Sequence, residues 1–226
     1  MTLKNKLGIT NEAELARQEE RISKKKALQL FENGDLDRMQ SGTFSTLAAI
    51  HKYLFEDIFA PVMYLGVSLE NIEKMPQSTF DEIVEKYVEM NVAHPFREGN
   101  GRSTRIWLDL IFKQELGLVV VWSKFVKNDY LMAMERSPVK SIEIKHILKQ
   151  ALTDKINDRE VYMKGIDASY HYEGYSLYKT EDIAKTKAKA KPQALSMEEW
   201  QANIAKAKKE NKTTKTHTLP QKEKDR

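Results

Sequence analysis

The sequence predicts an all-α fold, a compact domain from about residue 1 to 175 followed by a tail. Along most of that stretch apolar residues recur three and four positions apart, which is the spacing of one helix face. The 226 residues include only 9 glycines and 6 prolines, and alternating runs of β-branched residues, which mark strands, are nearly missing. Hydrophobic residues make up 41% of the chain, enough to form a core.

Helical patterns follow one another from residue 44 onward. The first covers residues 44–58, and the second begins at Pro61 and ends before Pro76. Proline suits the first turn of a helix and is excluded from its interior, so these two prolines set the limits of the second helix. Ser78 or Thr79 then provides the N-cap of a third helix.

The central helix is predicted from residues 106–112, which are apolar around nearly the whole circumference. A helix of this kind is buried on most sides. Gly117 is its natural C-cap. Shorter helices are expected near residues 128–136 and 142–151, and a last helix of the domain near 158–174.

The basic charge of the protein comes from its tail. Residues 176–226 carry 13 basic and 7 acidic residues, a net charge of +6, whereas the rest of the chain has a net charge of −2. A nearly neutral domain does not indicate a nucleic-acid-binding surface. We expect a lysine-rich, largely flexible tail with a short helix near 197–209, and we favour a solvated tail over one that binds nucleic acid.

Several classes of protein are excluded by what the sequence lacks. There is no cysteine, which rules out disulfides, thiolate nucleophiles and cysteine zinc sites. The N-terminal residues contain no apolar signal sequence, and no run approaches the roughly 18–20 apolar residues of a membrane span. A cytoplasmic protein without a membrane partner is therefore expected.

The most informative stretch is residues 94–105, His-Pro-Phe-Arg-Glu-Gly-Asn-Gly-Arg-Ser-Thr-Arg, between two predicted helices. Gly99, Asn100 and Gly101 allow a tight turn at the N-terminus of the second helix. Backbone N–H groups converge at such a turn, and the helix dipole adds positive potential there. The turn is therefore a candidate anion-binding site.

The side chains around this turn supply further chemistry. Arg102 and Arg105 share one helix face, and each guanidinium group is suited to bidentate binding of phosphate. Glu98 is a hard oxygen ligand of the kind that holds Mg²⁺ together with substrate phosphates, His94 is a candidate proton acceptor, and Phe96 is an apolar anchor. Singly, each has an ordinary structural explanation, but their combined spacing favours a site for a polyphosphate, a metal and a proton acceptor.

This stretch resembles the Fic motif, His-x-Phe-x-Asp/Glu-Gly-Asn-Gly-Arg-x-x-Arg, at every defining position. The flanking residues 87–93, 133–138 and 151–155 are also similar to Fic proteins. The resemblance covers roughly residues 6–175 and does not extend to the lysine-rich tail. It implies a Fic-type helical domain.

The resemblance also implies an activity. Fic enzymes of this kind are protein adenylyltransferases, nucleotidyltransferases that transfer AMP from ATP to a protein hydroxyl and release pyrophosphate. By this resemblance His94 is the base, Glu98 holds Mg²⁺, and residues 99–101 form the anion hole. Arg102 would contact the β-phosphate and Arg105 the γ-phosphate. Relatives that run a different reaction often lack the second arginine, so Arg105 favours AMP transfer.

Ser169, Glu173 and Gly174 resemble the inhibitory motif Ser/Thr-x-x-x-Glu-Gly/Asn of this family. Their position after the core is similar to that in family members with a C-terminal inhibitory helix. Ser169 and Glu173 are four apart and so lie on one helix face. A glutamate in the last helical turn is disfavoured by the helix dipole and needs a cationic partner. The resemblance names Arg105 as that partner; the alternative is a solvated glutamate before an ordinary C-cap glycine.

One feature departs from the family. Its members usually carry a β-hairpin flap that pairs with the target peptide by strand addition. Here Ile58 runs almost directly into Phe59-Ala-Pro, which leaves no space for a hairpin. The alternative function is therefore a non-catalytic or impaired nucleotide-binding or interaction module.

The resemblance implies partners as well. Besides ATP, it suggests a bacterial cytosolic target, with DNA gyrase and related topoisomerases as examples for similar enzymes. It also suggests a homo-oligomer.

Overall fold

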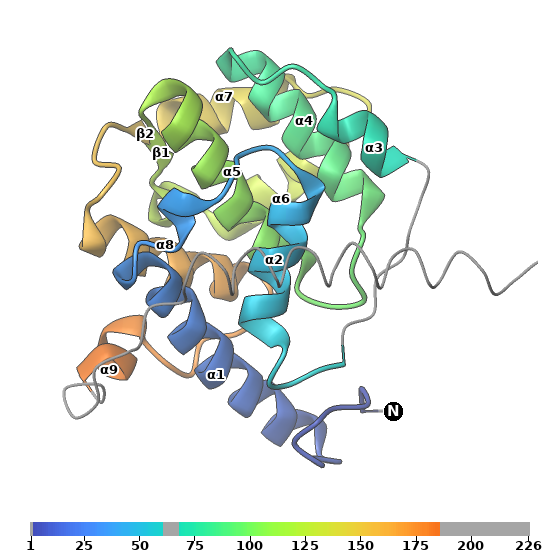
Figure 1. Ribbon diagram of the computed structural model, residues 1–226, viewed down its shortest axis with the longest axis vertical. Coiled ribbons are helices and arrows are strands. Elements are labelled where there is room, and N and C mark those ends of the chain that lie inside the picture. Colours follow the sequence, from blue (N-terminus) through green and yellow to red (C-terminus); the bar gives the residue numbers. More distant parts are fainter. Residues whose placement is uncertain (1, 61–67, 186–226) are drawn as a thin grey trace, which may run out of the picture.

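Helix α5, Asn100–Leu116, lies at the centre of the fold in a computed structural model that describes residues 2–60 and 68–185 (Figure 1). It packs against α2 (Phe44–Phe55), α4 (Phe80–Ala93) and α8 (Arg159–Tyr172). The long helix α1 (Glu12–Glu32) crosses α2 and α8. The structure is mostly helical, as the sequence predicts.

The remaining elements are short. They are helices α3 (Ser68–Glu73), α6 (Lys127–Arg136), α7 (Ile142–Gln150) and α9 (Thr180–Lys185), and the 3₁₀ turns η1 (Leu36–Arg38) and η2 (Trp122–Lys124). Strands β1 (Val119–Val120) and β2 (Leu152–Thr153) pair in antiparallel register, with Val119 opposite Thr153. The predicted second helix is observed only as α3, because its start at Pro61 lies outside the described residues.

The helix ends follow the expected capping chemistry. Thr79, rather than Ser78, caps α4, and it forms a reciprocal capping box with Glu82. Asp158 caps α8 by accepting hydrogen bonds from two backbone N–H groups of the first turn. Gly117 ends α5 in the left-handed conformation, φ +64°, which glycine adopts without strain.

The core is built around the apolar helix. Trp107, Leu108, Ile111 and Phe112 are completely buried, which confirms the prediction that this helix is covered on most sides. Its N-terminus, where the glycine-rich turn lies, is held at the junction of α1, α2 and α8. The core thus fixes the position of the motif.

The chain remains packed beyond the expected domain boundary at residue 175. Residues 176–185, with α9, lie along α1 (Figure 1). The buried Lys24 of α1 forms ion pairs with Glu20 at 3.1 Å and Asp167 at 2.9 Å, and donates to the carbonyl of Tyr178 at 2.5 Å. Glu20 accepts from the backbone N–H groups of residues 177 and 178. This long-range network follows no local sequence motif.

Two further expectations concern a helix in the tail and membrane-spanning segments. The short helix expected near 197–209 lies outside the described residues. None of the described helices has the length and apolar character needed to cross a membrane.

We expect Lys24→Met to lower the free energy of unfolding by about 3 kcal/mol, because it leaves the buried carboxylate of Glu20 without its cation. Chemical denaturation measures this effect. The matched control is Lys25→Met at an exposed position of the same helix. Equal stability of the two variants would contradict the importance given to the Lys24 network.

Candidate active site

The glycine-rich turn connects α4 to α5 through a strained and tightly packed backbone. His94 ends α4 in the left-handed conformation, φ +43°, and its side chain is exposed. Gly99 is the N-cap of α5 with φ +76°. A Cβ atom at Gly99 would lie 2.4 Å from the ring of Phe55, so both the conformation and the space require glycine.

The interior of the loop is held by Phe96 and Asn100. The amide of Asn100 accepts from the Phe96 N–H at 2.9 Å and donates to the Phe96 carbonyl at 2.6 Å. The buried Phe96 ring stacks on His51, with 3.8 Å between ring centroids. His51 Nε2 in turn bonds the carbonyl of Glu98 at 2.8 Å. Asn100 therefore shapes the turn with its side chain.

His51 is a component that the sequence does not predict. Burial lowers the pKa of His51 to about 4, so the imidazole is neutral near pH 7 and its Nε2–H donates to Glu98. His51 supports the loop through its contacts with Phe96 and Glu98 and is a structural residue of the site.

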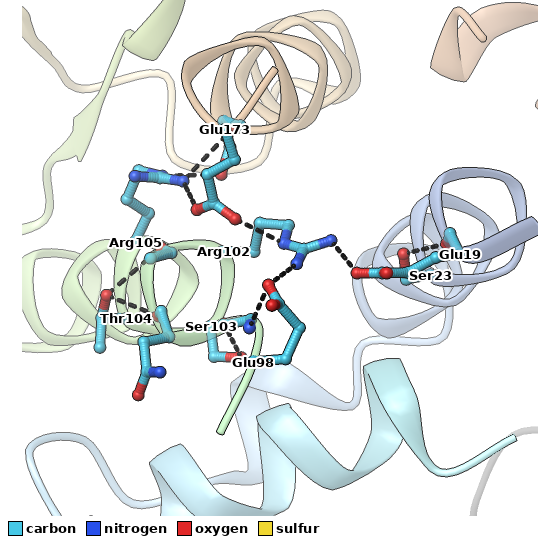
Figure 2. A network of polar contacts seen from close by, with 12 residues as sticks. Glu19, Ser23, Glu98, Arg102, Ser103, Thr104, Arg105 and Glu173 are labelled. Atoms are coloured by element: carbon cyan, nitrogen blue, oxygen red, sulfur yellow. Dashed lines mark hydrogen bonds and ion pairs between the residues drawn. The ribbon is translucent and has the colours of Figure 1, made fainter. Parts of the chain in front are cut away.

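Arg102 is the centre of a buried charge network (Figure 2). Its guanidinium contacts three carboxylates: Glu19 of α1 at 2.6 Å, Glu98 at 2.8 Å and Glu173 at 2.7 Å. Burial lowers the pKa of Arg102, but the charges of Glu173 and Glu19 outweigh it and raise the pKa well above its ordinary value. Arg102 is therefore a permanent cation.

Arg105 contacts the same glutamate. Its Nη2 atom lies 2.5 Å from Glu173 Oε1 and donates to the Ser169 carbonyl at 2.9 Å, and its Nε atom donates to Ser169 Oγ at 2.7 Å. The single carboxylate of Glu173 thus bridges Arg102 and Arg105, whereas the resemblance names Arg105 alone. Gly174 follows in the left-handed conformation and ends the helical segment.

Asp109 lies one helical turn after Arg105, where an ordinary ion pair between the two would be possible, but its contacts are elsewhere. Asp109 accepts from the Val120 N–H at 2.9 Å and from Trp122 Nε1 at 2.7 Å. It joins α5 to the segment that contains β1 and η2.

A cleft of about 490 Å³ brings the motif and Glu173 together. Its lining includes His94, Glu98, Gly101, Arg105 and Glu173. The opposite wall comes from α6, which the sequence does not assign to the site; its residues there include Tyr130, Leu131 and Met134. The cleft therefore combines a polar, cationic wall with a more apolar one.

The residues present fit a single Mg²⁺ held jointly with phosphates. Within the described ranges no group of three or more potential metal-binding side chains occurs, so an all-protein metal site is not indicated there. Glu98 lines the cleft and offers a carboxylate with 37% of its side chain exposed. One carboxylate plus substrate phosphates is a common arrangement for Mg²⁺.

Comparisons with known proteins identify relatives of this chain. Residues 37–112 match the family model of the Fic/DOC family. Over 165 residues the chain is 26% identical to a probable protein adenylyltransferase, y4lH, of Sinorhizobium fredii. This match covers 60% of this chain and 82% of the Sinorhizobium protein.

Solved structures with the same fold include two Bartonella proteins. The BepC protein of Bartonella tribocorum, with bound AMPPNP, is 18% identical with a TM-score of 0.55, over 68% of this chain and 93% of that one. The N-terminal Fic domain of a putative cell filamentation protein of Bartonella quintana, with bound ADP, is 19% identical with a TM-score of 0.53, over 67% and 91%. The resemblance to the Fic family is confirmed, and the helical fold is that of Fic domains.

Asp109 makes a pH-dependent contribution to stability. Burial raises the pKa of its carboxyl to about 7, against the opposing effect of its two hydrogen bonds. Between pH 4 and 7 the folded protein holds a proton that the unfolded chain has released, so the free energy of unfolding falls as the pH rises. The slope from this group is at most about 1.4 kcal/mol per pH unit.

Denaturation at several pH values measures this slope. The Asp109→Asn variant, whatever its absolute stability, should lose the contribution between pH 4 and 7. Asp154→Asn, at an exposed position, serves as the control. Parallel profiles for Asp109→Asn and the parent protein would refute the assignment.

Proposed function

We propose that this protein is a protein adenylyltransferase that transfers AMP from ATP to a hydroxyl group of a target protein and is restrained by Glu173. The observation that carries the proposal is the position of the Glu173 carboxylate, an anion bound to both motif arginines beside the glycine turn. The similar protein from Sinorhizobium fredii is named a probable protein adenylyltransferase, and two structures of the same fold hold AMPPNP or ADP.

The contacts of Glu173 support a phosphate at this place. A Cβ atom on Gly101 would lie 2.4 Å from Glu173 Oε1, so the carboxylate sits directly against the backbone of the turn. Arg102 Nε is buried and has no aligned hydrogen-bond acceptor, although Glu173 Oε2 is 2.7 Å away. A phosphate oxygen would give this N–H the acceptor that the carboxylate does not supply.

The remaining parts of the cleft suit the rest of a nucleotide. The side chains of Leu131 and Met134 face the cleft from α6 and form an apolar surface for a nucleobase. Mg²⁺, when held by Glu98 and the nucleotide phosphates, would neutralise phosphate charge.

Transfer requires a base beside the phosphate. In the proposed step the target hydroxyl oxygen forms a bond to the α-phosphorus, and the bond from that phosphorus to pyrophosphate breaks. His94 accepts the hydroxyl proton and pyrophosphate leaves with the bonding electron pair. His94 is exposed at the cleft, where a target side chain reaches it. The arginines and the turn stabilise charge on the phosphates.

The restraint follows from competition between two anions. While Glu173 bridges Arg102 and Arg105, phosphate oxygens cannot make the same contacts. Glu173 retains partial exposure, 23% of its side chain, so it lies at the surface of the cleft rather than behind the arginines. Its removal would leave both cations free for the nucleotide.

A second function has its own supporting observation. Between α2 and α3 the described residues 56–60 include no strand, and residues 61–67 lie outside the described chain. A protein without a flap to align the target would bind nucleotide but transfer AMP poorly, because misplacing reacting groups by about 1 Å costs on the order of 100-fold in rate. ATP binding without transfer by the released protein would favour this module.

We expect Glu173→Gly to bind ATP with Mg²⁺ at least about tenfold more tightly than the parent protein, since two charge-assisted contacts no longer compete with phosphate. Calorimetric titration measures the affinity. Labelled ATP with a lysate or with purified DNA gyrase measures transfer. Glu135→Gly is the matched control, because it removes another carboxylate of the cleft that also lies in a terminal helical turn. Unchanged binding and transfer in Glu173→Gly would end the restraint hypothesis.

In the Glu173→Gly background, His94→Ala should reduce AMP transfer by about 100-fold or more while ATP affinity changes little, because a base acts on the hydroxyl proton and not on the nucleotide. Mass detection of AMP on target proteins provides the measurement. His146→Ala, at an exposed position of α7, is the control. Full transfer by the His94 variant would show that another group is the base.

A further inference from the structure

A buried carboxylate outside the motif contacts its first arginine. Glu19 lies on α1, 83 residues before Arg102, and only 3% of its surface is exposed. Its Oε1 atom accepts from Arg102 Nη1 at 2.6 Å, a short charge-assisted hydrogen bond. Figure 2 shows Glu19 on the side of the guanidinium away from Glu173.

Glu19 also contacts the Tyr175 side chain, but of the three carboxylates on Arg102 it is the one that is neither released nor shared with the metal in the proposed function. Glu173 leaves when the restraint is released, and Glu98 is shared with the metal in the proposed function. Glu19 is enclosed between α1 and the motif, where burial raises the pKa of its carboxyl and the charge of Arg102 opposes this effect. Its contact is therefore the one that persists through the reaction.

Aromatic rings confine the same guanidinium from its other sides. The central guanidinium carbon lies 4.8 Å from the ring centroids of Phe55 and Tyr175 and 5.2 Å from that of Tyr170. Rings restrict where the group sits, but a hydrogen bond is needed to fix how it is rotated. Glu19 supplies that bond at Nη1, so that Nε and Nη2 face Glu173 and Glu98.

We propose that Glu19 is a positioning residue: it holds the Arg102 guanidinium in the orientation that binds the β-phosphate of the nucleotide. The inference rests on the proposed function, because it requires a nucleotide in the cleft. It adds α1 to the elements that build the site, although the motif and the flanking stretches 87–93, 133–138 and 151–155 that carry the resemblance all lie outside that helix.

The charges of the network allow an effect of lost positioning to be distinguished from an effect of changed charge, because the two change anion affinity in opposite directions. With Glu173 absent, Arg102 and Arg105 are balanced by Glu19 and Glu98. Replacing Glu19 by glutamine leaves one net positive charge, which by itself would strengthen binding of an anion. Weaker binding of a diphosphate after this replacement would therefore report lost positioning and not the change in charge.

The experiment uses the full chain with Glu173→Gly, alone and combined with Glu19→Gln, and compares the dissociation constants of ADP and AMP with Mg²⁺ present. ADP carries the β-phosphate that Arg102 would bind, and AMP lacks it. We expect Glu19→Gln to weaken ADP binding about tenfold, the loss of roughly one charge-assisted hydrogen bond, and to change AMP binding less than about twofold.

Glu20→Gln in the same background is the matched control. Glu20 is the adjacent, fully buried carboxylate of α1, but it bonds Lys24 and the backbone of residues 177 and 178 instead of an arginine of the motif. Its loss should leave the ratio of ADP to AMP affinity unchanged. Glu19→Asp, which keeps the charge and shortens the side chain, provides a second variant. It should also weaken the binding of ADP more than the binding of AMP.

The outcomes distinguish failure of the proposed function from failure of the positioning role of Glu19. Failure of the Glu173→Gly protein to bind ADP at all would reject the proposed function and the role of Glu19 with it. Normal binding in that protein, with unchanged or tighter ADP binding after Glu19→Gln, would overturn the positioning role alone. Equal weakening of ADP and AMP would also overturn it, because that result indicates general loosening of the site.

Discussion

The guanidinium group of Arg102, buried among three carboxylates, is the interaction on which the arrangement of this protein depends. Its partners come from three separate parts of the chain: Glu19 from α1, Glu98 from the loop before α5, and Glu173 from the end of α8. A buried cation without partners is very unfavourable, so these elements must assemble together for the site to form. The network specifies a geometry, and the surrounding apolar core provides the stability.

The same principle extends along α1 to the C-terminal segment. Lys24 and Glu20 bind the residues that follow α8, and Lys24 also pairs with Asp167 inside that helix. The end of α8, where Glu173 lies, is therefore held from both sides by one helix. Because α1 contacts both Arg102 and the segment after Glu173, the same helix supports the arginine and the glutamate of the network.

The sequence predicts the local parts of this structure better than the long-range ones. His94 to Arg105 lie within twelve positions, so a tight turn and one helix turn bring the turn glycines and the arginines to one place. The helix caps Thr79, Asp158 and Gly117 also act within a few residues. Glu19 and His51 join the site only through tertiary packing, and a charged residue on an ordinary amphipathic helix gives no local sign of such a contact.

In the proposed function, the double contact of Glu173 would allow one glutamate to act as the restraint. Each arginine of the motif has partners that remain when Glu173 is absent, Glu19 for Arg102 and Ser169 for Arg105. The two cations would thus stay in position whether the bound anion were the Glu173 carboxylate or a phosphate, and exchange between these anions would need movement of one side chain at the surface of the cleft. A site whose arginines were held by Glu173 alone would lose its geometry when the restraint was released. Separate partners for each arginine would divide the two tasks in the proposed function, because one side chain would regulate a site that others keep organised.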